Sequence, residues 1–313
     1  MSVAAYTAIE DRLQSIDPKG DLSGAVWIDL YKPGKADADR IAELGVTIPR
    51  LKDMGQIEPS RRLTRREEVD GITVLMTEPS GDGDDSFAPV TFLFTQTKLV
   101  TVRYHAERLW DGFTLTRRTT PGDVLAALLL LGVGHIADVL EAWDRELDVS
   151  ARDIFKEDAL KAPDLRRKIR ASGRMGEALS DIRLNLLIIR RAVVHLEQLR
   201  AEGRVSFSRK QAIKTLDRDV EALTVHADYL EGRLNLAVEA TMGLISLAQN
   251  DNARIHSIVA TIFLPATLIA SIFGMNFEWM PFLDWQFGFD ISLGLMVAAA
   301  CALLGILIYR RWL

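Results

Sequence analysis

The stretch that decides the fold is SIVATIFLPATLIASIFGMN, which runs from Ser257 to Asn276 near the end of the chain. No charged side chain occurs from Ser257 to Phe277, and a second charge-free run extends from Ile291 to Tyr309. A helix rises about 1.5 Å per residue, so each run is long enough to cross a hydrocarbon core of about 30 Å. The two runs therefore predict a hairpin of two membrane spans, with most of the protein upstream of it.

The charges that flank these runs predict an orientation. We place the spans at about 256–275 and 291–310, with an outer loop at 276–290. Arg254 precedes the first span and Arg310 follows the second, whereas the loop carries acids and no Lys or Arg. By the positive-inside rule, both chain ends face the cytoplasm and the loop faces outward. This arrangement favours a multi-pass protein of the inner (plasma) membrane.

Composition agrees with a soluble part attached to a membrane part. The 313 residues are 48% hydrophobic and 26% charged, with a mean hydropathy of +0.08. Charge crowds the first part of the chain and apolar residues the last. The net charge of -5 argues against a nucleic-acid partner, because general nucleic-acid binders are usually basic. Cys301 is the only cysteine, so a disulfide within one chain is impossible, which suits a cytosolic soluble part.

Residues 1–120 have the pattern of a mixed α/β domain. Short runs of β-branched, aromatic and other apolar residues, bounded by turn residues, predict strands at 25–30, 72–76, 90–94 and 99–103. A short amphipathic helix is expected at 37–44.

Over residues 121–250 the spacing of apolar residues becomes that of helices. One helix is expected from Pro121 to about Leu160, a second after Pro163, and a third from Ser206 or Ser208. The third has no proline before Pro265, so it is expected to continue into the membrane as a long stalk helix. The apolar stripes indicate core packing first and a partner interface second.

These patterns together predict the fold class. It is an α+β cytoplasmic domain, with a mixed sheet flanked by helices, followed by the stalk helix and the two-helix transmembrane hairpin at 251–313.

At Gly274-Met275-Asn276 a family resemblance becomes specific. The passage TLIASIFGMNFEWMP, followed by DWQFGF, a second apolar span and a terminal RRWL, resembles the CorA family of magnesium channels. The likeness is dense from about residue 216 onward and thin before it. It implies a homopentamer shaped like a funnel, in which the first span lines a central pore and the second faces lipid. It also implies that the cytoplasmic domain senses intracellular Mg²⁺, which is both the transported and the regulatory ion.

The resemblance places pore residues on the first span and the helix before it. Gly274, Met275 and Asn276 match the selectivity filter, with Asn276 at the pore entrance; the matching pore-lining positions are Ser271, Thr267, Leu264, His256 and Asn250. A symmetric ring of amides suits Mg²⁺, which dehydrates reluctantly and prefers oxygen neighbours. Taken alone, Asn276 favours a helix C-cap just past the span, and only its context favours the filter.

His256 stands where relatives carry an apolar gate residue. It is either a neutral histidine at the membrane mouth or a pH-sensitive or metal-selective gate.

Three acids outside the pore match family positions. Asp53 and Asp219 resemble aspartates that bind regulatory Mg²⁺ between subunits, although Lys52 replaces an acid beside the first of them. Glu278 matches a loop position whose acids attract cations electrostatically. Each of the three is otherwise an ordinary solvated surface charge.

The favoured function is a passive Mg²⁺ channel driven by the membrane potential, which also passes Co²⁺ or Ni²⁺ and is gated by intracellular Mg²⁺. Two alternatives remain. One is a Zn²⁺ transporter of the related ZntB type, against which Met275 weighs; the other is a membrane-tethered scaffold or sensor that conducts nothing. No P-loop, HExxH or GxSxG motif and no Cys/His cluster is present, so enzyme activity has no support from the residues.

Overall fold

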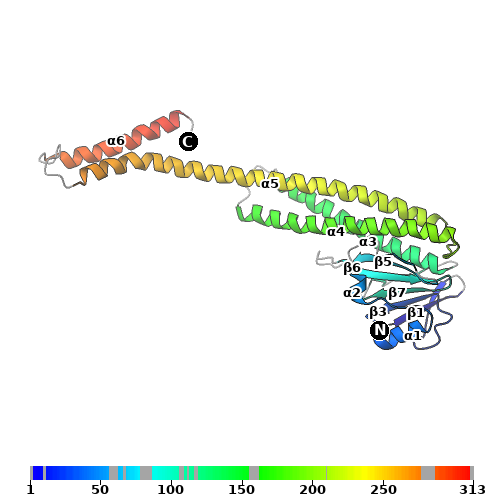
Figure 1. The fold of residues 1–313 in the computed structure, drawn as a ribbon. Helices are drawn as coiled ribbons and strands as arrows, with labels where there is room; N and C mark the ends of the chain where they lie inside the picture. The colour runs from blue at the N-terminus through cyan, green and yellow to red at the C-terminus, as the bar shows by residue number, and fades with distance from the viewer. Residues whose placement is uncertain are drawn as a thin grey trace. The chain divides into compact units, whose positions relative to one another are not determined.

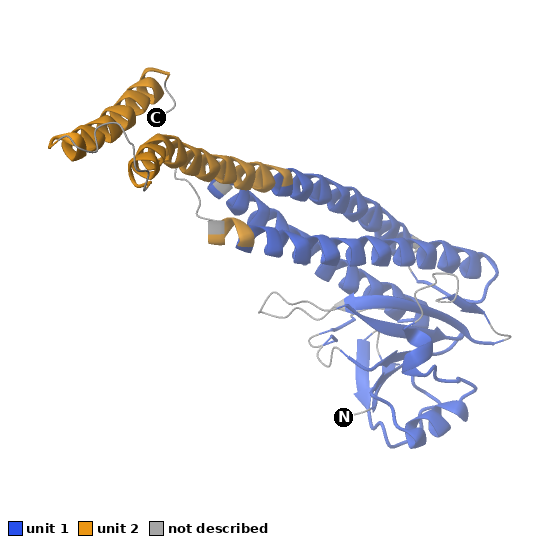
Figure 2. Ribbon diagram, turned by 60° about the vertical axis from the view of Figure 1, so that its left-hand side comes forward, with its two compact units in different colours: residues 1–159, 167–238 blue, residues 160–166, 239–313 orange. Residues whose placement is uncertain are grey.

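The fold was analysed in a computed structural model of the whole chain (Figure 1). The structure describes residues 3–9, 12–55, 63–65, 68–77, 87–105, 109–110, 113–115, 119–154, 162–208, 210–275 and 286–310. It divides into two compact units, one of residues 1–159 and 167–238 and the other of residues 160–166 and 239–313 (Figure 2).

The first unit begins with a seven-stranded mixed sheet in the order β2-β1-β3-β7-β6-β5-β4. Its strands are β1 (Val3–Ile9), β2 (Arg12–Ile16), β3 (Trp27–Tyr31), β4 (Leu63–Arg65), β5 (Asp70–Thr77), β6 (Phe87–Phe94) and β7 (Leu99–Arg103). All neighbouring strands are antiparallel except β3 and β7, which run parallel at the centre of the sheet. β6 and β7 form a hairpin, in which the Thr95 amide donates to the Lys98 carbonyl at 2.9 Å.

Consecutive side chains of a strand point to opposite faces of the sheet. In this sheet both faces are buried. On one face, Trp27 and Phe92 belong to the large core that also contains the apolar stripes of the long helices. On the other face, Ile28 and Val100 pack with residues of the short helices α1 (Lys35–Ala42) and α2 (Leu51–Met54). The central strands therefore have apolar residues on both sides.

Three long helices follow the sheet: α3 (Pro121–Ile154), α4 (Ala162–Ala201) and α5 (Lys210–Phe273). Within the first unit they lie side by side, and their buried apolar residues form one continuous core with the sheet (Figures 1 and 2). α4 is followed by Gly203, whose φ of +76° is left-handed, a conformation that glycine adopts without strain.

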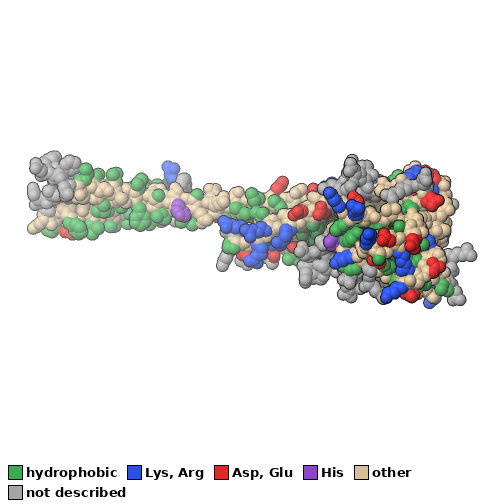
Figure 3. Space-filling model, turned by 60° about the horizontal axis from the view of Figure 1, so that its bottom comes forward, with side chains coloured by type: hydrophobic (Ala, Val, Ile, Leu, Met, Phe, Trp, Pro, Cys, Tyr) green, Lys and Arg blue, Asp and Glu red, His purple; other side chains and the backbone are tan. Residues whose placement is uncertain are grey.

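The last helix is α6 (Gly288–Tyr309). Among the described residues, three helices are long and apolar enough to cross a membrane, in α3, α5 and α6. The apolar window of α3 is 56% buried inside the protein, whereas those of α5 and α6 are only 6% buried. Core packing therefore accounts for the apolar residues of α3, and the exposed windows of α5 and α6 are the two membrane spans. Figure 3 shows hydrophobic side chains along these spans and most of the charged ones elsewhere.

The structure confirms the predicted fold class, a mixed sheet flanked by helices with a long helix and a C-terminal helical hairpin. The third long helix does continue without interruption to Phe273. Strands β1, β2 and β4 and helix α2 were not predicted. The division into parts at residues 120 and 250 stays a prediction, as does the pentameric funnel.

Candidate pore face and regulatory sites

The five positions predicted to line a pore lie on the last part of α5. Asn250, His256, Leu264, Thr267 and Ser271 are all exposed in the single chain, and Leu264 has an exposed fraction of 72%. Successive residues of a helix are about 100° apart, so these five positions share one side of α5. That side mixes amide, imidazole and hydroxyl groups with a leucine, whereas the rest of the span is almost wholly apolar.

Two threonines on the span bond back to their own helix. The Thr261 hydroxyl donates to the Ser257 carbonyl and the Thr267 hydroxyl to the Phe263 carbonyl, each at 2.8 Å. A hydroxyl that gives its proton to the helix keeps its lone pairs for outside donors.

Pro265 lies inside the span and has no backbone N–H, so the Thr261 carbonyl lacks the usual helical donor. Membrane helices tolerate such a proline because nearby groups satisfy the freed carbonyl.

His256 makes one local contact that fixes its tautomer. Its Nδ1 lies 2.7 Å from the Asn252 carbonyl oxygen, one turn earlier. A carbonyl only accepts, so Nδ1 carries the proton and Nε2 is the free acceptor of the neutral ring. Whether this histidine acts as a gate stays a prediction.

α5 ends where the predicted filter begins. The Gly274 amide still donates to the Ala270 carbonyl at 2.9 Å, and the Met275 amide to the Ile272 carbonyl at 3.3 Å. A β-carbon at Gly274 would lie 3.1 Å from the Ala270 oxygen, so glycine permits the close final turn. Asn276 and Glu278, predicted at the pore entrance and in the outer loop, lie outside the described residues.

The two predicted regulatory acids belong to different elements of the first unit. Asp53 lies on α2 and Asp219 on α5, and both are exposed. In the part of the chain that the structure describes, no three His, Cys, Asp or Glu side chains gather as a metal site would require.

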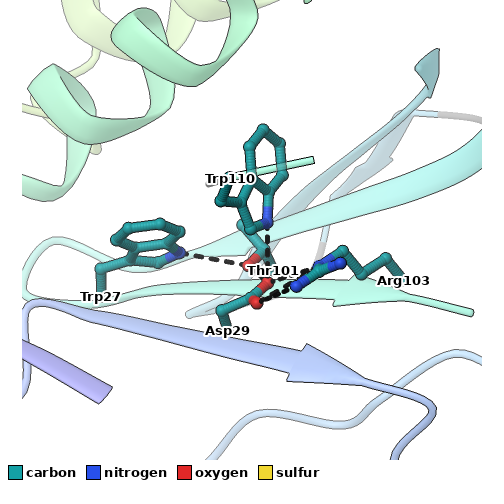
Figure 4. Close-up of polar contacts among 5 residues, drawn as sticks. All are labelled: Trp27, Asp29, Thr101, Arg103 and Trp110. Carbon is teal, nitrogen blue, oxygen red and sulfur yellow. Dashed lines mark hydrogen bonds and ion pairs between the residues drawn. The ribbon is translucent and has the colours of Figure 1, made fainter. Parts of the chain in front are cut away.

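The sheet holds a buried polar cluster that was not predicted (Figure 4). The Asp29 carboxylate accepts hydrogen bonds from Thr101 at 2.5 Å, from Trp110 Nε1 at 2.9 Å and from the Arg103 guanidinium at 2.8 Å. Trp27 Nε1 in turn donates to the Thr101 hydroxyl at 3.1 Å. Since each of these polar groups has a partner, the cluster is structural and leaves no obvious place for a ligand. An acid inside the run Val-Trp-Ile-Asp-Leu was the sequence feature that could have indicated it.

Three comparisons with known proteins agree with this architecture. A family model described as "CorA-like Mg2+ transporter protein" matches residues 23–311. The magnesium transport protein CorA of Pasteurella multocida is 31% identical over 310 residues, which cover 94% of this chain and 95% of that protein. CorA of Haemophilus influenzae is 29% identical, with 95% and 96% covered. The complete structure of the CorA magnesium transporter from Methanocaldococcus jannaschii matches 100% of this chain with a TM-score of 0.73, at 16% identity.

Proposed function

This chain belongs to the CorA-like Mg²⁺ transporter family, and from that membership we propose that it carries Mg²⁺ across the membrane as a passive channel. The observation that carries the proposal is the match to magnesium transport proteins along nearly the whole length of both chains. The two exposed apolar helices and the polar side of α5 support it.

We infer that identical subunits surround the pore, as a homopentamer. One chain offers a single Asn276, Thr267 and Ser271, and a ring of identical subunits turns each into a ring of oxygen ligands. These groups suit the water shell of Mg²⁺, because amide and hydroxyl oxygens accept hydrogen bonds from bound water. Leu264, one turn from Thr267, forms an apolar ring at which dewetting would stop a hydrated ion.

The membrane potential supplies the driving force. A divalent cation that moves inward gains about 4.6 kcal/mol per 100 mV, twice the value for a single charge. In the proposed orientation both termini lie in the cytoplasm and Glu278 faces outward, where its charge raises the local cation concentration. Uptake by this route needs no ATP.

Regulation by the transported ion is a further part of the proposal. Asp53 of one subunit and Asp219 of a neighbour would share Mg²⁺ when the cytoplasm is replete. Their carboxylates offer the oxygen ligands that Mg²⁺ prefers, and their exposure on the single chain leaves both free for a contact between subunits.

An uptake assay in proteoliposomes tests the function. The purified chain is reconstituted with a Mg²⁺ indicator inside, an inward potential is applied, and Co²⁺, Ni²⁺ and Zn²⁺ are offered as competitors. We expect potential-dependent Mg²⁺ entry that Co²⁺ and Ni²⁺ compete with. Entry of Zn²⁺ without Mg²⁺ would favour a ZntB-type transporter, and entry of no cation would favour a tethered scaffold.

A further inference from the structure

α5 leaves the core of the first unit at an identifiable turn. Its buried apolar side chains face α3 and α4 and end with Leu234, which is 4% exposed. No apolar side chain of α5 beyond Leu234 is buried among the described residues. Among the described residues, the one buried side chain of α5 beyond Leu234 is the polar Thr241, so Leu234 is the last apolar anchor of this helix before the proposed pore-lining positions.

Arg233 links the turn of α5 just before Leu234 to α3. The Arg233 guanidinium pairs with Asp148 at 2.5 Å and also with Asp144, one turn away on the same face of α3. The guanidinium also lies 5.6 Å from the centre of the Tyr229 ring on its own helix. The hydrogen bond to Asp148 raises the pKa of Arg233, so the guanidinium keeps its positive charge at physiological pH. Because one rigid guanidinium meets two carboxylates, it limits both sliding and rotation of α5 against α3.

A second arginine fastens the same turn to α4. Arg183 of α4 donates from Nε to Asp228 at 3.0 Å and pairs through its terminal nitrogen with Glu231. Asp228 and Glu231 are three residues apart on α5, so they lie on one face. Arg183 and Arg233 thus hold residues 228–233 from two sides, directly before the last buried leucine. We call these two arginines, with their four carboxylates, the double clamp.

We propose that Arg183 and Arg233 are positioning residues for conduction: the double clamp couples the cytoplasmic unit to the pore segment of α5. This rests on the proposed function, since it concerns how internal Mg²⁺ closes that pore. From Leu234 to Phe273, α5 extends about 58 Å. A tilt of about 5° at the clamp would displace the far end of a straight helix of that length by about 5 Å, so small changes there reach the pore.

The experiment uses the full-length protein in proteoliposomes with graded internal Mg²⁺. Arg233→Gln, and Arg183→Gln with Arg233→Gln, remove the clamp, and Arg190→Gln serves as a matched control for an exposed arginine of α4. We expect both clamp variants to need at least about fivefold more internal Mg²⁺ for half-inhibition than the wild type or the control. Asp148→Arg combined with Arg233→Asp reverses the pair and should restore the wild-type curve. Wild-type inhibition in the variant that carries both Arg183→Gln and Arg233→Gln would overturn the proposal.

Hydrogen exchange of the full-length protein gives a second, independent measurement. Amides of residues 228–240 should exchange faster in the double variant than in Arg190→Gln, whereas the sheet should be unchanged. Equal exchange in residues 228–240 would overturn the clamp whether or not uptake is seen. A wild type that takes up no Mg²⁺ would refute the proposed function, and this measurement would still decide whether the clamp holds α5. A loss of thermal stability with no shift in half-inhibition would assign the arginines a merely structural role.

Discussion

The Arg103 guanidinium pairs with the Asp29 carboxylate across the only parallel strand pair of the described sheet, β3 and β7, at 2.8 Å. Both side chains are buried, with exposed fractions of 8% and 6%. Removing one partner leaves the other charge buried and uncompensated, which typically costs about 3 to 5 kcal/mol. We therefore expect Asp29→Ala to lower the melting temperature of the first unit on the order of 10 °C.

The check is thermal unfolding of the full-length protein followed by circular dichroism. Glu202→Gln is the control, because Glu202 pairs with Arg65 at the surface and should contribute little. A shift at Asp29 no larger than that at Glu202 would show that the buried cluster does not stabilise the sheet.

A ring assembly follows from the proposed pore, since one chain cannot surround an ion. Phe263, Leu264 and Leu268 have exposed fractions of 66%, 72% and 61% in the single chain, so the span has ample apolar surface for neighbours and lipid. We expect native mass spectrometry in detergent to find a homopentamer. A monomer or dimer as the only species would contradict the ring.

Asn276 is expected to set ion entry. Asn276→Ala removes the ring of amide oxygens without removing core volume, so it should reduce Mg²⁺ uptake to that of protein-free liposomes and leave assembly intact. Ser292→Ala is the control on the other span, because the Ser292 hydroxyl donates to the Phe289 carbonyl of its own helix at 2.8 Å. Uptake at the wild-type rate in Asn276→Ala would show that the filter lies elsewhere.

Local patterns were sufficient to predict much of this fold. The spacing of apolar residues and the positions of turn residues predict strands at 72–76, 90–94 and 99–103 and an uninterrupted third helix. All of these elements are present. Strand β1, Val-Ala-Ala-Tyr-Thr-Ala-Ile, was missed because small and polar residues interrupt its apolar pattern. Its pairing with β3 makes this segment a strand. Such pairing is a tertiary effect that cannot be predicted from the spacing of apolar residues along the sequence.

The polar contacts were harder to predict, because they join residues far apart in the sequence. Asp29 and Arg103 meet only through the parallel β3–β7 register. Arg233 meets Asp148 only because α3 and α5 pack together. Spacing rules for helices predict ion pairs within one helix, three or four residues apart, and say nothing of pairs between helices. The pore positions came from family resemblance, and Asn276 and Glu278 still rest on it alone.

Acid should weaken the first unit through His195. Burial is the largest effect on His195 and lowers its pKa. The positive charges of Arg65 and Arg204 lower this pKa further. The carboxylates of Asp70 and Glu202 raise it, but the net shift is downward. His195 Nε2 is buried and lacks a hydrogen-bond partner among the described residues. The unfolded chain, with an ordinary pKa of about 6.5, therefore binds a proton at a higher pH than the folded chain does. Between the two pKa values stability rises with pH, so it is lost as pH falls through about 6.5.

The measurement is the melting temperature at pH 7.5 and pH 5.5. The wild type should melt a few degrees lower at pH 5.5, and His195→Gln should reduce that difference. His105→Gln, which alters an exposed histidine, should keep it. Equal pH dependence in wild type and His195→Gln would mean that other groups cause it.

The last prediction concerns regulation by Mg²⁺ at Asp53 and Asp219. In a replete cytoplasm, Mg²⁺ between these carboxylates of neighbouring subunits would offset their mutual repulsion and hold the subunits together. Loss of the ion would restore the repulsion and loosen the contact, and α5, which carries Asp219, would then shift together with Leu264. Mg²⁺ has this effect only if it binds the closed arrangement better than the open one. Coupling of this kind is typically about 1 to 3 kcal/mol, so a few such sites suffice to bias a ring.

Asp53→Asn with Asp219→Asn keeps the size of both side chains and removes both charges. This variant should therefore continue to conduct at internal Mg²⁺ concentrations that close the wild type, while its uptake at low internal Mg²⁺ is unchanged. Asp217→Asn, two residues from Asp219 on α5, is the matched control and should close as the wild type does. Asp217→Asn also removes a negative charge from α5, so the comparison separates the loss of a specific ligand from a general loss of negative charge on this helix. Asp217 is partly buried, whereas Asp219 is exposed. Equal inhibition of all three proteins by internal Mg²⁺ would place the sensor on other residues of the first unit.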